Sequence, residues 1–362
     1  MKKFMHVEKK IRHIIDMAIN NPEAAKFCGK SLLKSEVEKR IRVFASSVIR
    51  GSQDQDLTGY LYEVDWLEEK AVKKIPIPID TKHPFWNARG GNRGGRGLFL
   101  KGDKLYIATA MSILVFDKQL NQLAEISHPY LADIHEIFIV EDGIWVTSTV
   151  HDMVVKIDFN GALLKEWRGD QSAILQKKFG YHERNLNLSL DFSRNSFEDD
   201  FENYKKDEIF HINSVWVEGE DVYILSCWKN AFIRIFPKPE EIITIDNSLH
   251  HPHNGILSPA GTIIINDTKH QYLREYDLKS GKRLKTLSTP VFQQNIRGSS
   301  QFSRPGWQRG LVHVVDTIYL VGTSPATIFE VDIDRGLIGK ILYLENNVSH
   351  SIHGLGVYLP NL

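Results

Sequence analysis

Residues 250–282 read HHPHNGILSPAGTIIINDTKHQYLREYDLKSGK. A polar, histidine-rich segment leads into a short apolar strand, a Pro-Ala-Gly turn, a β-branched strand, a third strand and a Ser-Gly turn. This order is typical of antiparallel strands joined by tight turns. The same unit recurs along the chain at about 40 residues, which is the period of a propeller blade. The sequence therefore predicts an all-β repeat fold.

The number of blades follows from how the repeats begin and end. Five units align on their second strands, which begin at Leu105, Ile144, Val222, Thr262 and Ile318. Residues 42–50, 59–67 and 72–79 supply three strands without an inner partner, and residues 352–359 supply an inner strand without its outer three. Joining the two parts closes a ring and leaves no free sheet edge. We therefore expect a six-bladed β-propeller over residues 42–362, closed by the C-terminal strand, with seven blades as the main alternative.

The N-terminal segment, residues 1–41, has a helical pattern. Pro22 is placed to begin a short second helix that Gly29 ends, and Leu32 to Ile41 form a third. The first helix has apolar residues at three-to-four spacing on one face: Met5, Ile11, Ile14, Ile15, Ala18 and Ile19. We expect an N-terminal helical extension that packs on the propeller or on a second subunit of a homo-oligomer.

Composition excludes several classes of partner. Lys and Arg number 45 and Asp and Glu also number 45, so bulk charge favours neither a nucleic acid nor a membrane surface. The two cysteines, Cys28 and Cys227, have no metal-binding spacing and are expected to be reduced thiols. The N-terminus has no signal-peptide core, and no uncharged apolar run approaches a membrane span. These features predict a cytoplasmic protein.

Axial side chains can be predicted from the repeat. Stepping back nine residues from each second strand reaches the start of the preceding inner strand, and inner strands line the axis of a propeller. The aligned positions form one ring of Arg96, His135, Asn213, His253, Arg309 and His353. A second ring, two residues earlier and therefore on the same strand face, contains Asp133, His211, His251, Trp307 and Ser351. Three consecutive blades contribute polar pairs, which favours a functional site over a hydrated channel without activity.

Two arginine- and glycine-rich loops lead to the same mouth of the propeller, residues 89–96 and 297–309. Arginine forks suit carboxylate, sulfate or phosphate. We therefore expect a small anionic substrate bound by Arg93, Arg96, Arg309, His353 and Trp307. An insertion at residues 171–208 mixes aromatic and acidic residues, and its length is typical of a lid, a partner-binding segment or a disordered loop.

One stretch resembles a known family. His211-Ile212-Asn213-Ser214, followed by Val222 to Lys229, is similar to the His-x-Asn-Ser strand of bacterial PAPS-independent arylsulfate sulfotransferases. The resemblance implies a six-bladed propeller with axial histidines, with His253 in the place of the nucleophile and His135 in that of an upstream axial histidine. The family's functional arginine has no counterpart near residues 226–229. More loosely, the repeat resembles propellers of the NHL and SMP-30 type.

Three hypotheses follow. In the first, the protein is a group-transfer enzyme or hydrolase, with His253 as nucleophile or general base, His135 and His211 as acid/base partners and Asn213 as oxyanion donor. In the second, His135, His211, His253 and His251 hold a divalent metal (Fe, Zn, Mn or Cu) in an oxygenase, lyase or hydrolase. In the third, the propeller binds an anionic ligand or a protein without catalysis.

Overall fold

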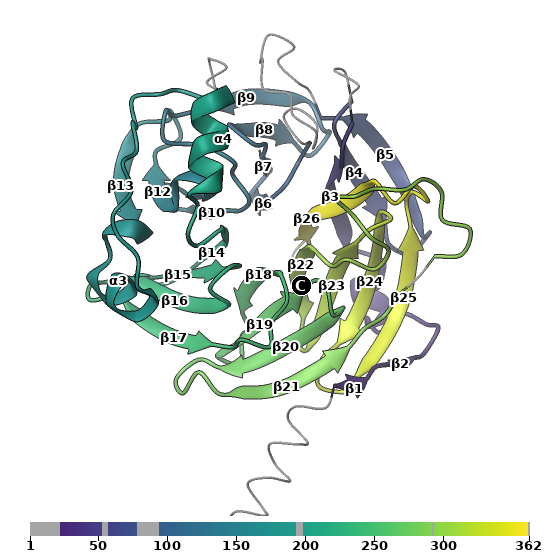
Figure 1. Ribbon diagram of the computed structural model, residues 1–362. Helices are drawn as coiled ribbons and strands as arrows, with labels where there is room; N and C mark the ends of the chain where they lie inside the picture. Colours follow the sequence, from purple (N-terminus) through teal and green to yellow (C-terminus); the bar gives the residue numbers. More distant parts are fainter. Residues whose placement is uncertain (1–21, 53–56, 78–93, 193–197, 292, 361–362) are drawn as a thin grey trace, which may run out of the picture.

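The structure, a computed structural model, describes residues 22–52, 57–77, 94–192, 198–291 and 293–360. Within these ranges, antiparallel strands form six sheets arranged around one axis as the blades of a β-propeller (Figure 1). The predicted fold class and number of blades are therefore confirmed. Strand formation follows the sequence pattern, because most strands carry β-branched and aromatic side chains between turns of Gly, Asp and Asn.

Within each blade, successive strands follow one another from the axis outward. The first blade consists of β26 (His350–Tyr358), β3 (Arg42–Ile49), β4 (Tyr60–Asp65) and β5 (Lys70–Pro76). The second consists of β6 (Leu98–Lys101), β7 (Lys104–Ala108), β8 (Ile113–Asp117) and β9 (Gln122–Ile126), and the third of β10 (Ile137–Val140), β11 (Gly143–Ser148), β12 (Met153–Ile157) and β13 (Leu163–Arg168). The fourth consists of β14 (Ile212–Glu218), β15 (Asp221–Ser226), β16 (Ala231–Phe236) and β17 (Glu241–Ile245). The fifth consists of β18 (Pro252–Leu257), β19 (Thr262–Asp267), β20 (Tyr272–Asp277) and β21 (Arg283–Ser288), and the sixth of β22 (Gly310–Val315), β23 (Ile318–Thr323), β24 (Thr327–Asp332) and β25 (Leu337–Tyr343).

Ring closure occurs as the sequence predicts. The C-terminal strand β26 pairs antiparallel with β3, from His350 opposite Ile49 to Tyr358 opposite Arg42. Ile352 of β26 is fully buried and also packs on the sixth blade, because a Cβ added to Gly322 of β23 would lie only 2.4 Å from its Cγ2 atom. The two ends of the repeat region therefore belong to one blade, and that blade packs closely against the sixth.

The N-terminal prediction was wrong for the second helix and is confirmed only in part for the third. In place of a helix after Pro22, two short strands lie parallel to outer strands of the propeller: β1 (Glu23–Ala24) on β21 and β2 (Lys26–Phe27) on β25. Only α2 (Ser35–Glu38) is helical between residues 32 and 41. The predicted first helix lies outside the described residues. Unpaired backbone groups at the two blade edges accept the segment as strands, which overrides its helical pattern.

The insertion contains most of the remaining helix. The 3-10 turn η2 (Gly169–Gln171) and the helix α3 (Ala173–Phe179) begin it, and the helix α4 (Glu198–Lys206) ends it. A further 3-10 turn, η1 (Thr149–His151), follows β11. Figure 1 shows α4 between the second and third blades, with its lower end close to β10. No helix among the described residues is both long and apolar enough to cross a bilayer, and Cys28 and Cys227 are both free.

Candidate functional site

The predicted ring residues occupy equivalent places at the start of the inner strands, and all are buried: Arg96, His135, Asn213, His253, Arg309 and His353. Two positions before the first four of them, the backbone repeats one unusual conformation. Gly94, Asp133, His211 and His251 have φ of 64°, 53°, 50° and 55°. This left-handed region is rare for residues other than glycine. Its recurrence shows that one local turn precedes these inner strands.

Four imidazoles gather on the axis. The ring centroids of His135 and His211 are 4.8 Å apart, those of His135 and His353 5.9 Å, those of His253 and His353 5.9 Å, and those of His135 and His253 6.4 Å. Each histidine comes from a different blade. The structure therefore brings His135, His211 and His253 within reach of one small ligand and adds His353 to them.

Hydrogen bonds determine the tautomer of His253. Its Nδ1 atom lies 3.0 Å from the carbonyl oxygen of His251 and 3.0 Å from the Thr268 hydroxyl. The carbonyl only accepts, and the Thr268 hydroxyl donates its hydrogen to the Gln308 carbonyl at 2.7 Å. Nδ1 must therefore be the donor to both oxygens, and the lone pair of the neutral ring is on Nε2.

His135 is held in the same way in the third blade. Its Nδ1 atom lies 2.9 Å from the Asp133 carbonyl and 3.1 Å from the Thr149 hydroxyl, which donates to the Ile212 carbonyl at 2.5 Å. The two threonines thus perform the same task in two blades, and the sequence analysis missed both. Because the Asp133 carbonyl only accepts, Nδ1 of His135 is protonated and Nε2 has the lone pair, although the donor Nη1 of Arg96 also lies 3.1 Å from Nδ1. A nitrogen of this kind can act as a base, as a nucleophile or as a metal ligand.

The axial environment keeps three of the rings uncharged. Burial lowers the pKa of His135, His253 and His353 well below the ordinary value. Neighbouring guanidinium groups lower it further: Arg96 beside His135, Arg309 beside His253 and Arg50 beside His353. Among the described residues, neither ring nitrogen of His353 has a hydrogen-bond partner. His135, His253 and His353 are therefore neutral imidazoles in a positive field.

His211 differs from the other three because it has a carboxylate partner. Its Nδ1 atom donates to Glu208 at 2.7 Å, and its ring stacks on the Trp228 indole with centroids 5.2 Å apart. The Glu208 side chain is fully buried. A carboxylate in this position stabilises positive charge that develops on an imidazole. Glu208 lies at the end of the insertion, and its spacing of three residues from His211 was the only signal in the sequence.

The insertion reaches the axis through Lys205 of α4. Lys205 forms a salt bridge with Asp133 and lies 3.7 Å from Glu208. Asp133 also accepts a hydrogen bond from Arg96 at 2.7 Å, with both side chains almost completely buried. A continuous network thus runs from Arg96 through Asp133, Lys205 and Glu208 to His211. This network ties α4 to the histidine cluster.

Arg96 and Arg309 differ in what they contact. The Arg96 guanidinium is used by Asp133 and by the Ile134 carbonyl, to which it donates at 2.5 Å. Arg96 therefore stabilises the network, and its guanidinium group is not placed as a bidentate donor to an anion. The Arg309 guanidinium lies 5.1 Å from the centroid of a Trp307 ring and close enough to His253 to lower its pKa. Arg309 and Trp307 are thus brought to the site together.

The other predicted site residues are placed as follows. Asn213 donates through Nδ2 to the Pro252 carbonyl at 2.7 Å, while its Oδ1 atom is buried without a partner among the described residues. His251 is exposed and stacks on His250, with centroids 5.4 Å apart. Arg93 lies outside the described residues. In the part of the chain that the structure describes, no group of three or more His, Cys, Asp or Glu side chains is arranged to hold a metal ion.

Comparisons with known proteins identify the fold. No family model matches the chain, and no curated protein matches it. A protein of unknown function from Bacteroides caccae aligns with 88% of this chain and 98% of its own at 9% identity and a TM-score of 0.53. A chain of a nidogen/laminin complex aligns over the same shares at 9% identity and a TM-score of 0.55. These likenesses show the propeller fold alone.

A more partial match is virginiamycin B lyase from Staphylococcus aureus. It aligns with 68% of each chain at 14% identity and a TM-score of 0.41, which is too limited to carry a functional argument. The resemblance to arylsulfate sulfotransferases rests on the sequence motifs alone.

Proposed function

We propose that this chain is a cytoplasmic enzyme that transfers or hydrolyses an anionic group of a small molecule, in the manner of an arylsulfotransferase. The observation that carries the proposal is the state of His253. Its Nδ1–H is fixed by two oxygens, its ring is held neutral, and its Nε2 lone pair is therefore left for chemistry. A neutral, oriented imidazole is what nucleophilic or general-base catalysis requires.

The proposed first step forms a bond between Nε2 of His253 and the sulfur or phosphorus atom of a bound ester. The bond from that atom to the ester oxygen breaks, and the leaving oxygen takes a proton from Nε2 of protonated His211, whose charge Glu208 stabilises. In the second step, a hydroxyl acceptor or water returns a proton to His211 and takes the group from His253. Atoms, protons and charge balance over the two steps.

Positive charge around the cluster supports an anionic substrate. Arg309 and Arg50 both contribute to the low pKa of His253 and His353, so their charges lie close to these rings. An anionic group placed between the rings would meet this field and the unpaired nitrogens of His353. Arg96 and Lys205 act one step away, by holding Asp133 and Glu208 in place.

A divalent-metal enzyme is the second candidate. Imidazoles whose Nδ1–H is held by an oxygen are typical of metal ligands, and Fe, Zn, Mn and Cu accept such donors. The donor chemistry fits, while the side chains, as they are placed, form no metal-holding group among the described residues. No step is therefore assigned to a metal.

The test uses tag-free full-length protein with 4-nitrophenyl sulfate and 4-nitrophenyl phosphate, with phenol as acceptor. We expect release of 4-nitrophenol by the unmodified protein, loss of at least 100-fold in turnover for His253→Ala and for His211→Ala, and no change for the exposed control His182→Ala. Thermal melts confirm that the variants fold. Stoichiometric metal by elemental analysis would favour the metal enzyme. If neither ester reacts and no metal is bound, the sulfotransferase-like proposal fails and a binding propeller remains.

A further inference from the structure

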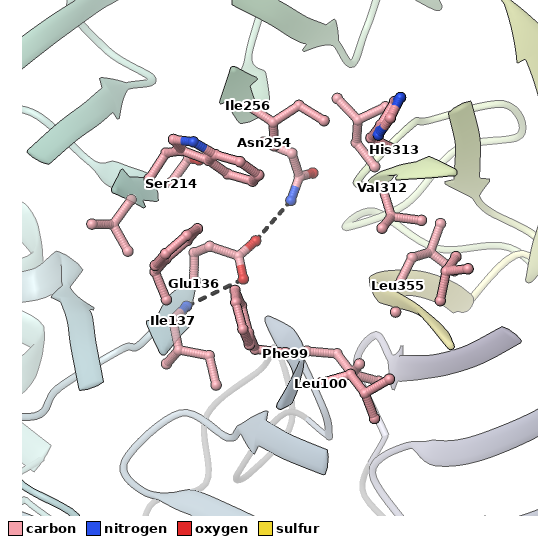
Figure 2. A pocket seen from close by; sticks show the side chains of 17 residues that line it. Phe99, Leu100, Glu136, Ile137, Ser214, Asn254, Ile256, Val312, His313 and Leu355 are labelled. Atoms are coloured by element: carbon pink, nitrogen blue, oxygen red, sulfur yellow. Dashed lines mark hydrogen bonds between the residues drawn. The ribbon is translucent and has the colours of Figure 1, made fainter. Parts of the chain in front are cut away.

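A cavity lies farther along the same inner strands, away from the histidine cluster. Its volume is about 280 Å³, and side chains from all six inner strands line it (Figure 2). The lining is mainly apolar and includes Leu98, Leu100, Ile256, Leu311 and Leu355. The proposed function uses none of these residues. A concave, mostly apolar space with a few polar groups has the character of a small-molecule site.

Aromatic rings form one wall of this cavity. Phe99 and Phe138 meet edge to face with centroids 4.8 Å apart, and Phe138 and Trp216 meet in the same way at 4.9 Å. The three rings belong to three adjacent blades. In such a contact the edge of one ring covers one face of the other, and the ring faces that remain uncovered are electron-rich and attract organic cations.

One acidic side chain, Glu136, faces the same space. Its Oε2 atom accepts a hydrogen bond from Asn254 Nδ2 at 2.9 Å, and its Oε1 atom accepts one from the Ile137 N–H at 3.2 Å (Figure 2). Among the described residues, no Lys, Arg or His forms an ion pair with it; His313, which also lines the cavity, has its Nε2 atom 2.9 Å from the Asp316 carbonyl oxygen. Burial accordingly raises the pKa of Glu136 to about 8.

The backbone is shaped to place this carboxyl group. A Cβ on Gly97 would lie 2.2 Å from Oε1 of Glu136, so only glycine leaves room for it. On the other side, β18 has an irregular register between His253 and Gly255, and the residue between them, Asn254, has φ of 46°. Bulges of this kind redirect a side chain, and here the redirected amide is the donor to Glu136. The carboxyl is thus held by two local adjustments of the chain.

We infer that this cavity binds a small organic ammonium ion with an apolar body, whose charge pairs with Glu136 and whose body lies against Phe99, Phe138 and Trp216. A carboxyl without a counter-ion in an apolar site gains most from a ligand that brings the missing positive charge. An anionic ligand would oppose ionisation of the carboxyl, and a purely apolar ligand would leave it protonated and without a charged partner. The site is distinct from the histidine cluster, and it calls for the opposite ligand charge.

The test measures binding by calorimetry with three probes of similar shape: 2-phenylethylamine, 2-phenylethanol and 3-phenylpropanoate. We expect the amine to bind at least 10-fold more tightly than the alcohol and the carboxylate not to bind. Glu136→Gln keeps the shape of the side chain and removes its charge, so it should weaken amine binding at least 10-fold and leave alcohol binding unchanged. The matched control is Glu141→Gln, an exposed glutamate in the following turn, which should bind like the unmodified protein.

Proton release gives an independent readout. At pH 6 most of the Glu136 carboxyl groups are protonated before binding, so pairing with an ammonium should release about one proton, seen as a dependence of the binding enthalpy on the buffer. Glu136→Gln should abolish this release. Three outcomes would each overturn the inference: no amine binding at 1 mM, equal binding of amine and alcohol, or amine binding that Glu136→Gln leaves intact. Loss of ester turnover in His253→Ala bears only on the other site.

Discussion

The contact between Ile352 and Gly322 offers a quantitative test of ring closure. Ile352 lies on β26 of the first blade and is fully buried, and it occupies the space that a Cβ on Gly322 of the sixth blade would need. Ile352→Ala is expected to cost about 2–5 kcal/mol, because it removes buried groups and leaves a cavity. Gly322→Ala is expected to cost about 1–3 kcal/mol, because the new methyl group overlaps the isoleucine.

The double variant separates this contact from general damage. Ile352→Ala removes the Cγ2 atom that lies 2.4 Å from the new methyl group and leaves only the Cβ atom, 2.9 Å away, to crowd it. The two single costs should therefore sum to at least about 1 kcal/mol more than the double variant loses. The assay is urea unfolding of the full chain followed by fluorescence, with thermal melts alongside. As a control, Ile144→Ala in the third blade, also fully buried, should combine additively with Gly322→Ala. Strict additivity of the Ile352 and Gly322 costs would refute this packing of the C-terminal strand.

Three further predictions follow from the same structure. Deleting residues 352–362 should prevent folding, because β3 would lose its inner partner; a truncated monomer that melts like the full chain would contradict this. The pKa of His135, His253 and His353 is lowered in the folded chain, so the unfolded chain binds protons at a higher pH than the folded one. The free energy of unfolding should therefore keep its full value above about pH 6.5 and decrease as the pH falls below it. His353→Gln should reduce the slope of this acid-side decrease by up to about 1.4 kcal/mol per pH unit. Arg309→Ala should weaken binding of an anionic ligand by about 1.5–3 kcal/mol with little loss of stability. Arg96→Ala should destabilise the fold by about 1.5–3 kcal/mol, because it removes one of the two cationic partners of the buried Asp133 and leaves Lys205 as the other. Similar melting temperatures for the two variants would argue against this division.

The repeat made much of the fold predictable. Strands at a regular spacing, and an inner strand at the C-terminus without partners of its own, led to six blades and to the pairing of β26 with β3. The same alignment placed His135, His253 and His353 on the axis, because equivalent residues in a repeat share an orientation. The axial position of His211 was predicted from the two-residue period of a strand, because it precedes Asn213 by two residues. In each case, local sequence and global symmetry require the same arrangement.

What the sequence could not predict lies where that symmetry ends. Glu208 and Lys205 belong to an insertion that no other blade has, so nothing in the alignment pointed to their contacts with His211 and Asp133. The pairing of Arg96 with Asp133 crosses from one blade to the next, and it changes an expected anion ligand into a supporting residue. The strands β1 and β2 form only because outer strands offer them free edges, which a helical pattern in one segment cannot reveal.

The left-handed turn that precedes four of the inner strands also limits which sequences this scaffold tolerates. At Gly94, Asp133, His211 and His251, the backbone suits glycine and short polar side chains, and it disfavours valine, isoleucine and threonine whatever the surroundings. Folded variants from a library that varies these positions should therefore carry mainly Gly, Asn, Asp and His there. His and Asp are also frequent catalytic residues. The backbone geometry at this end of the propeller therefore favours reactive side chains even without selection for activity.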